Sequence, residues 1–123
     1  MSHQVETIPP DMPLAEVRDK ILETGHQGFP LVNAQGQLIG IITGRDVAAA
    51  LKAQPVEGKS LPAIEVANRS LIVAHPNETL DLVWERLRRN RIGHLPVVSR
   101  DDPDRLLGLI TRGDLIRFRG KAP

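Results

Sequence analysis

Two short segments of the sequence place a threonine three positions before an aspartate, directly after an apolar run. In GIITGRD, at residues 40–46, the pair is Thr43 and Asp46, and GLITRGD, at 108–114, repeats it as Thr111 and Asp114. At the start of a helix this spacing is typical of a capping box, which satisfies otherwise unpaired backbone N–H groups. A helix start can also bind a phosphate, because its free N–H groups and its dipole attract anions. Local spacing alone favours the capping box.

The type of acidic residue favours a second role. Capping boxes prefer Glu or Gln, whose side chains reach back to the N–H of the capping residue more easily than that of Asp, which is one methylene shorter. Both copies nevertheless carry Asp. A carboxylate near a helix N-terminus can accept hydrogen bonds from the two ribose hydroxyls of a nucleotide, as in dinucleotide-binding folds. These features predict two nucleotide sites.

The two segments belong to an internal repeat. Apolar and proline positions recur 66 residues later, as Pro30 and Pro96 do, and the offset becomes 68 after the next turn, as for Gly40 and Gly108. The second copy has two more residues in that turn, SRDDPDR in place of NAQGQ. A repeat of this length indicates two related structural units.

Each copy predicts the same order of elements: a short apolar stretch, an amphipathic helix, two buried strands and a second helix. The apolar stretches are residues 5–8 and 71–74. The helical stripes are Leu14, Val17, Ile21 and Leu22 in the first copy and Leu80, Val83, Trp84 and Leu87 in the second. The predicted strands are 29–32, 38–42, 95–98 and 106–110, and the second helices are 46–53 and 114–119. The fold class is therefore α/β (α+β), with two β-α-β-β-α repeats packed on each other.

The repeats divide the chain into residues 1–52, a linker over 53–70 and residues 71–123. Breakers interrupt the linker at Pro55 and Gly58. Ser60 is a candidate N-cap for a short helix that ends at Val66.

Composition excludes several kinds of function. The chain has no cysteine, and its four histidines show no metal-ligand spacing, so we expect no metal site. No apolar run approaches the ~18 residues of a membrane span, and the N-terminus lacks a signal-peptide pattern. No nucleophile and base are placed together by the pattern, so we expect no enzyme. The first 61 residues carry a net charge of −2 and the rest +3, which weakly favours an anionic partner for the second half.

The doubled unit, with GHLPVV followed by LLGLITRGDL and a parallel set in the first copy, resembles a tandem pair of CBS domains, a Bateman module. The resemblance covers essentially the whole chain. It implies pseudo-two-fold packing of the repeats, self-association into a homodimer, and a regulatory role in which adenosine-containing ligands such as AMP, ADP or ATP bind in clefts between the repeats. No cofactor is required, since the nucleotide acts as a regulatory ligand.

The resemblance also assigns roles to residues. Asp46 and Asp114 would hold the ribose, and Thr43 and Thr111 would contact ribose or phosphate. The residues that would line the base pockets are Ile8, Phe29, Pro30, Val73, Leu95 and Pro96.

Three basic side chains stand beside these segments. Arg45 and Arg112 are candidates for phosphate contacts, because guanidinium groups form charge-assisted hydrogen bonds to phosphate. His94 either faces a ligand or is a hydrogen-bonded, half-buried histidine. Arg45 directly precedes its aspartate whereas Arg112 stands two positions before Asp114, so the two sites are not equivalent.

The parent protein and one alternative function stay open. The segment from Val97 to Arg119 is most similar to the C-terminal cytoplasmic CBS pairs of prokaryotic chloride-channel-type transporters, which implies a cytoplasmic part of a larger membrane protein. A free-standing CBS protein is the rival. The alternative function is a ligand-free dimerisation or interaction module. The basic run at 85–91 is interpreted as a solvated helix face rather than a nucleic-acid surface, and Trp84 as either core or dimer face.

Overall fold

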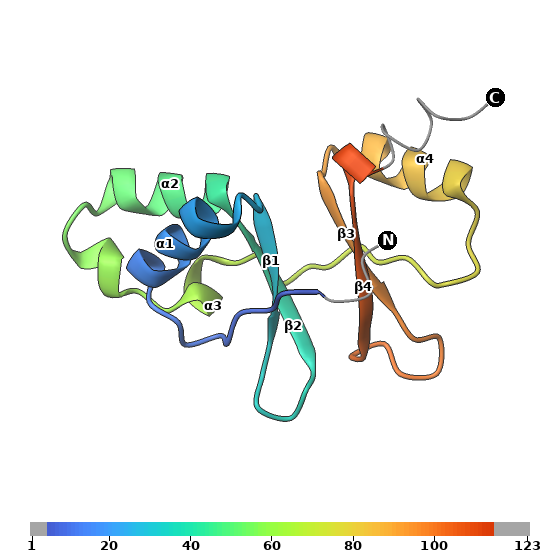
Figure 1. Cartoon of the computed structure of the whole chain (residues 1–123), viewed down its shortest axis with the longest axis horizontal. Coiled ribbons are helices and arrows are strands. Elements are labelled where there is room, and N and C mark those ends of the chain that lie inside the picture. The colour runs from blue at the N-terminus through green and yellow to red at the C-terminus, as the bar shows by residue number, and fades with distance from the viewer. Residues whose placement is uncertain (1–4, 115–123) are drawn as a thin grey trace. The chain divides into compact units, whose positions relative to one another are not determined.

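The computed structural model describes residues 5–114 (Figure 1). The chain divides into two compact units, residues 6–71 and the described residues 72–114 together with Val5. Each unit contains its own antiparallel strand pair and its own hydrophobic core.

The first unit is built on strands β1 (Gly28–Val32) and β2 (Leu38–Thr43). Their register pairs Gly28 with Thr43 and Phe29 with Ile42. The expected strand at 5–8 is shorter than predicted, because only Ile8 forms a parallel bridge, to Leu31. The N–H of Ile8 donates to the carbonyl of Pro30 at 3.0 Å, and the carbonyl of Ile8 accepts from the N–H of Val32 at 3.1 Å.

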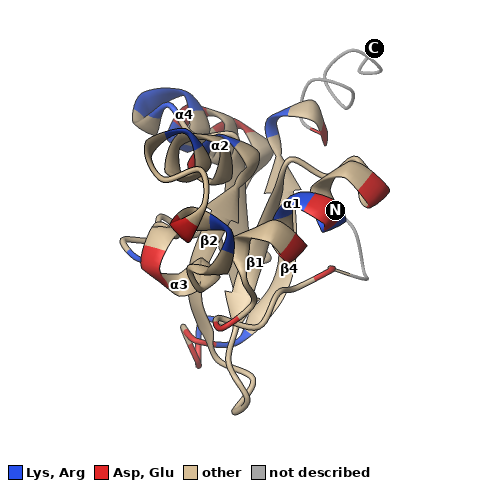
Figure 2. Cartoon of the chain, turned by 90° about the vertical axis from the view of Figure 1, so that its left-hand side faces the viewer, with Lys and Arg blue, Asp and Glu red and all other residues tan. Residues whose placement is uncertain are grey.

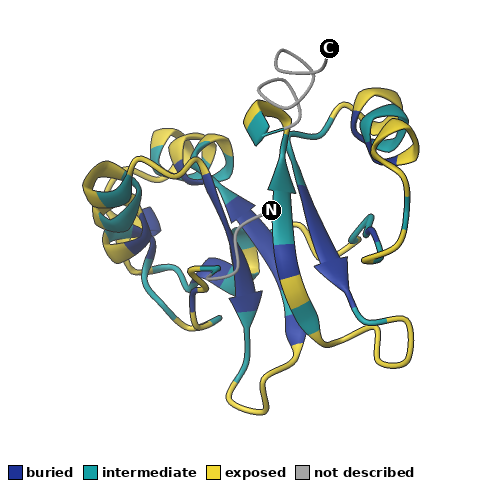
Figure 3. Cartoon of the chain, turned by 45° about the vertical axis from the view of Figure 1, so that its right-hand side comes forward, coloured by how far each residue is buried: buried dark blue, intermediate teal, exposed yellow. Residues whose placement is uncertain are grey.

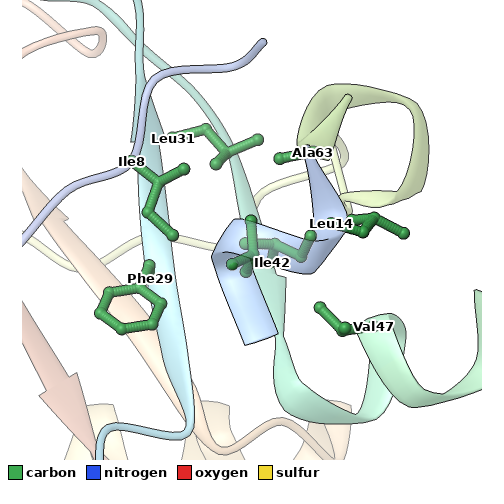
Figure 4. Close-up of a cluster of buried hydrophobic side chains, with 8 residues drawn as sticks. Ile8, Leu14, Phe29, Leu31, Ile42, Val47 and Ala63 are labelled. Carbon is green, nitrogen blue, oxygen red and sulfur yellow. The ribbon is translucent and has the colours of Figure 1, made fainter. Parts of the chain in front are cut away.

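Helices cover this sheet as the stripe predicts. Helix α1 (Leu14–Thr24) buries Leu14 and Val17, and α2 (Gly44–Ala53) buries Val47. Figure 4 shows Ile8, Leu31 and Ile42 gathered on the side of the sheet that faces α1. Burial of each such side chain contributes roughly 1.5–3 kcal/mol. The prediction that Leu22 belongs to the buried stripe is wrong. Its side chain is 77% exposed, because the core extends round the helix only as far as Ile21.

The linker forms two short helices rather than one. A 3-10 helix η1 spans Glu57–Ser60, and α3 spans Ala63–Val66. The prediction that Ser60 caps the second helix is wrong, because its hydroxyl donates to the carbonyl of Glu57 at 3.1 Å and ends the first. Pro62 stands at the N-cap of α3 without a side-chain cap, since the N–H of Ala63 is bonded to the carbonyl of Met12.

The second unit repeats the strand pair and the first helix. Strands β3 (His94–Val98) and β4 (Leu106–Thr111) pair antiparallel, and helix α4 (Leu80–Asn90) packs Val83 and Leu87 into the core. The apolar stretch at 71–74 again contributes a single bridge, between Ala74 and Val97. Figure 3 shows β3 buried along most of its length and β4 more exposed. The second helix expected at 114–119 lies outside the described residues beyond Asp114.

Candidate functional site

Thr43 and Asp46 form a complete capping box at the start of α2. The N–H of Asp46 donates to Thr43 Oγ1 at 3.2 Å, and the N–H of Thr43 donates to Asp46 Oδ2 at 2.9 Å. Thr43 has extended backbone angles, φ −115° and ψ 164°, as an N-cap residue requires. The shorter carboxylate of Asp46 therefore does reach the cap N–H, so the preference of capping boxes for Glu or Gln is no argument against a cap here.

The second copy has the same geometry. Thr111 donates its N–H to Asp114 Oδ2 at 3.1 Å and accepts from the N–H of Asp114 at 3.1 Å. The repeat thus reproduces a three-dimensional arrangement and not only a sequence pattern.

Capping leaves part of the first pair unused. The second carboxylate oxygen of Asp46 accepts no hydrogen bond from residues 5–114, and the hydroxyl of Thr43 accepts but does not donate within the same range. One acceptor and one donor thus remain at the end of β2. Two acceptor directions on a carboxylate suit vicinal hydroxyls.

Strand register brings further residues to this edge of each sheet. Gly28 lies opposite Thr43, and His94 lies opposite Thr111. The N–H of Gly44 donates to the carbonyl of Gln27 at 2.8 Å, and the corresponding bond in the second unit runs from Arg112 to Gly93 at 2.9 Å.

These bonds change the expectation of an anion site on the helix backbone. In each copy the N–H groups of the threonine, of the next residue and of the aspartate are already bonded within the unit. Side chains are therefore the main groups left at these turns that can contact a phosphate.

The predicted base-pocket residues are mostly core residues. Ile8 and Phe29 belong to the first hydrophobic cluster, with exposed fractions of 0% and 1%. Leu95 belongs to the second cluster, Pro30 and Pro96 are buried in their strands, and Val73 is half-buried. Their role in a base pocket stays a prediction, because most of these side chains are buried in the cores of their own units.

The three basic candidates differ in environment. Arg45 is exposed and forms no ion pair within the described residues. Arg112 is also exposed, and its Nη2 lies 3.4 Å from the carbonyl oxygen of Ile92, a long and weak contact. His94 is half-buried, and burial lowers its pKa although the nearby Asp114 carboxylate acts in the opposite direction. The imidazole is therefore neutral at pH 7.

One charged cluster was not anticipated from the sequence. Arg86 donates to both carboxylate oxygens of Glu78, at 2.9 and 2.6 Å, and to the carbonyl of Val73 at 2.8 Å. Glu78 also accepts from the N–H of His75 at 2.8 Å. The cluster fixes the backbone around Val73, one of the predicted pocket residues. Its only sequence signal is an acid two residues before the helix and an arginine in the middle of it.

The other arginines of α4 agree with the solvated face that was predicted. Arg88 and Arg89 are exposed and form ion pairs with Glu85 on the same helix, at 2.8 and 3.6 Å. Trp84 is half-buried and packs against the second core. No group of three metal-ligating side chains occurs among residues 5–114, and no helix in this range is both long and apolar enough to cross a membrane.

The sequence and the structure of this chain are both similar to those of one known family. The family model described as CBS domain matches residues 1–53 and again 63–121. Protein MJ1225 of Methanocaldococcus jannaschii is 36% identical over 120 residues, which are 98% of this chain and 41% of that protein. The CBS domain-containing protein YhcV of Bacillus subtilis is 31% identical over 94% of this chain and 79% of its own length. The chain thus spans less than half of one relative and most of the other.

A solved structure has the same fold as this chain over nearly its full length. The CBS domain pair of protein MJ0100, in complex with 5′-methylthioadenosine and S-adenosyl-L-methionine, superposes with a TM-score of 0.85 and is 31% identical. The match covers 98% of this chain and 91% of that one. CBS pairs are regulatory modules rather than catalytic ones. Two family matches, each containing one strand pair and one Thr-x-x-Asp turn, show that this chain belongs to the CBS domain family as a tandem pair.

Proposed function

We propose that this CBS pair binds adenosine-containing small molecules of the AMP, ADP and ATP class and thereby regulates an attached or partner protein. The observation that carries the proposal is the unused acceptor of Asp46 beside the unused donor of Thr43. Such a pair can accept from ribose hydroxyls and donate to a ribose or phosphate oxygen without disturbing the helix cap.

A related protein supports the class of ligand. The CBS pair of MJ0100 is solved with 5′-methylthioadenosine and S-adenosyl-L-methionine, which share an adenosine group with vicinal ribose hydroxyls. In the present chain Asp46 and Asp114 hold the ribose, Thr43 and Thr111 contact ribose or phosphate, and the arginines beside them meet phosphate. The apolar residues named above line the base.

The test uses a substitution that keeps the cap. In Asp46→Asn the amide oxygen still accepts from the N–H of Thr43, but the second oxygen becomes an NH₂ group that donates and cannot accept from a ribose. Calorimetric titration of the wild type and the variant with AMP and with 2′-deoxy-AMP then measures how much affinity depends on the 2′-hydroxyl in the presence and in the absence of the Asp46 acceptor. Removal of a hydrogen bond to a charged group costs about 1.5–3 kcal/mol, or about ten- to one-hundred-fold in affinity.

The expected pattern is a double-mutant cycle. The wild type should bind AMP more tightly than 2′-deoxy-AMP, and the variant that removes the working aspartate should no longer distinguish them. Asp114→Asn is the same test for the second copy. If both variants bind AMP as the wild type does, the aspartates serve only as caps and the proposed site is wrong.

The completeness of both capping boxes favours a second candidate function, a ligand-free dimerisation or interaction module. In that case no adenosine compound binds the wild type, and the Thr-x-x-Asp segments only stabilise helices. The exposed leucines Leu22 and Leu82 support a homodimer in either case. Sedimentation of the wild type against Leu22→Gln and Leu82→Gln measures whether these surfaces hold copies together.

The parent context is part of the proposal. We place the repeats at 1–52 and 71–123 with a linker at 53–70, and the module in the cytoplasm. An attached chloride-channel-type transporter receives no support from the relatives named above, whereas YhcV, of which the chain covers 79%, favours a free-standing CBS protein. Affinity capture with and without AMP identifies which protein the pair regulates.

A further inference from the structure

We propose that the two copies select different adenosine compounds: the second copy favours phosphorylated ones through Arg91 and Arg112, whereas the first, with Arg45 alone, has a weaker preference. The inference rests on the proposed function, because it needs adenosine to bind at the Thr-x-x-Asp segments. It adds a specificity residue, Arg91, that neither the sequence pattern nor the aspartates point to.

The first observation is how Arg112 meets the turn that follows α4. Its backbone N–H is bonded to the carbonyl of Gly93, and its guanidinium reaches toward the carbonyl of Ile92. Arg91 is the residue before Ile92, so both arginines stand at the edge of the sheet where Thr111 and Asp114 lie. Both are exposed, and neither guanidinium forms an ion pair with a carboxylate among residues 5–114.

The equivalent positions of the first copy carry no charge. Gly25 stands where the second copy has Arg91, and Gly44 stands where it has Arg112. One arginine, Arg45, remains at that edge. Near the end of α1, two residues before Gly25, the first copy has Glu23 where the second has Arg89. A polyanion is therefore attracted more strongly to the second site.

The backbone of Arg91 is the second observation. It ends α4 in the left-handed conformation, with φ 55° and ψ 42°, and Gly25 ends α1 in the same region with φ 77°. Glycine is the usual residue at such a helix end, because a side chain there is strained. The second copy keeps an arginine at a position whose backbone suits glycine, and a strained residue of this kind points to a functional constraint.

Other arginines nearby contribute less. Figure 2 shows Lys and Arg along α4, but Arg88 and Arg89 are paired with Glu85, which neutralises part of their charge. Arg86 is held by Glu78. Of the described α4 cluster and its turn, Arg91 and Arg112 are the arginines without a carboxylate partner, so they are the ones able to bind phosphate oxygens directly.

The test separates the sites before it probes the arginines. Asp46→Asn leaves the second site and Asp114→Asn leaves the first, and each protein is titrated with adenosine, AMP and ADP at 0.15 M salt. With the second site alone, ADP should bind about ten-fold more tightly than adenosine, the ratio expected for a hydrogen bond to a charged group. With the first site alone, the ratio should stay below about three-fold, as for an exposed ion pair.

Arg91→Gly is the decisive variant, because glycine suits the backbone there. It should melt no lower than its parent and yet lose most of the preference for ADP, while adenosine binds unchanged. Arg112→Gln should act in the same direction. Arg105→Gln is the matched control. Arg105 is also exposed and forms no ion pair within residues 5–114, but it lies in the turn at the far end of the β3–β4 hairpin, roughly 17 Å away along five strand residues.

Each outcome decides between the two proposals. If adenosine binds in an aspartate-dependent way but Arg91→Gly and Arg112→Gln keep the ratio of ADP to adenosine affinity, the selectivity proposal fails and the nucleotide function stands. An equal ratio at the two isolated sites, or an equal loss in Arg105→Gln, overturns it as well. If no adenosine compound binds the wild type, the proposed function itself is wrong and this inference falls with it.

Discussion

Arg86 and Glu78 form a bidentate ion pair that joins the middle of α4 to the segment before it, with donor–acceptor distances of 2.9 and 2.6 Å. The same guanidinium donates to the carbonyl of Val73, so one side chain connects the helix, its preceding turn and the short bridge segment. The first copy has Met12 and Lys20 at the equivalent positions, and Lys20 pairs with Glu6 instead. The cluster is therefore specific to the second unit.

This pair predicts an acid-sensitive second unit. The hydrogen bonds from Arg86 lower the pKa of Glu78 from 4.5 to about 2. Because the folded-state pKa is depressed, the stabilisation is fully present above pH 4.5 and is lost as the pH falls toward 2. With solvent screening it amounts to ~2 kcal/mol. Urea unfolding of wild type and Glu78→Gln should differ by this amount at pH 7, and the difference should shrink at pH 3. A pH-independent difference would contradict the ion-pair account.

His94 predicts a second pH dependence, at milder acidity. Burial lowers its pKa below 6.5 in the folded state, so the unfolded chain takes up the proton first. Stability should therefore fall as the pH drops below about 6.5, and the loss ends below the folded-state pKa. In His94→Gln the unfolding free energy should change less between pH 7 and pH 5. His26→Gln, which replaces an exposed histidine, is the control and should follow the wild type.

The cap of α2 predicts a stability change that does not involve a ligand. Thr43→Ala removes the oxygen that accepts from the N–H of Asp46, which should lower the unfolding free energy by ~1 kcal/mol. Thr43→Ser keeps that oxygen and should retain most of the stability. Equal losses in both variants would mean that the methyl group, and not the hydrogen bond, matters at this position. Denaturant unfolding without nucleotide measures both.

The left-handed residue Arg91 predicts a stabilising substitution. Arg91→Gly should relieve the cost of a side chain at φ 55°, about 1 kcal/mol, although the more flexible unfolded chain offsets part of the gain. The matched substitution is Arg89→Gly, inside α4, which should destabilise by about 1 kcal/mol because glycine is a poor helix former. Melting temperatures of the two variants should move in opposite directions.

Several features could be predicted because they depend on local pattern. The 66-residue offset identified the repeat, and the branched runs around Phe29 and Leu95 identified strands that are buried in the structure. Thr43 and Asp46 were placed correctly at a strand-to-helix turn. Other predictions were wrong where contacts with neighbouring segments determine the burial or the hydrogen bond of a residue. Leu22 follows the helical stripe but lies beyond the edge of the core, and Ser60 ends one short helix instead of starting another.

The sequence by itself determined the doubled unit, its order of elements, the absence of thiol chemistry and the positions of the two Thr-x-x-Asp turns. These follow from periodicity and residue type, which act over a few neighbouring positions. The tertiary structure alone decided that the short Asp reaches the cap N–H, that Arg86 meets Glu78 eight residues away, and that Arg91 lies in the turn which Arg112 contacts. Those relationships depend on backbone direction and on contacts between segments, which a linear pattern does not contain.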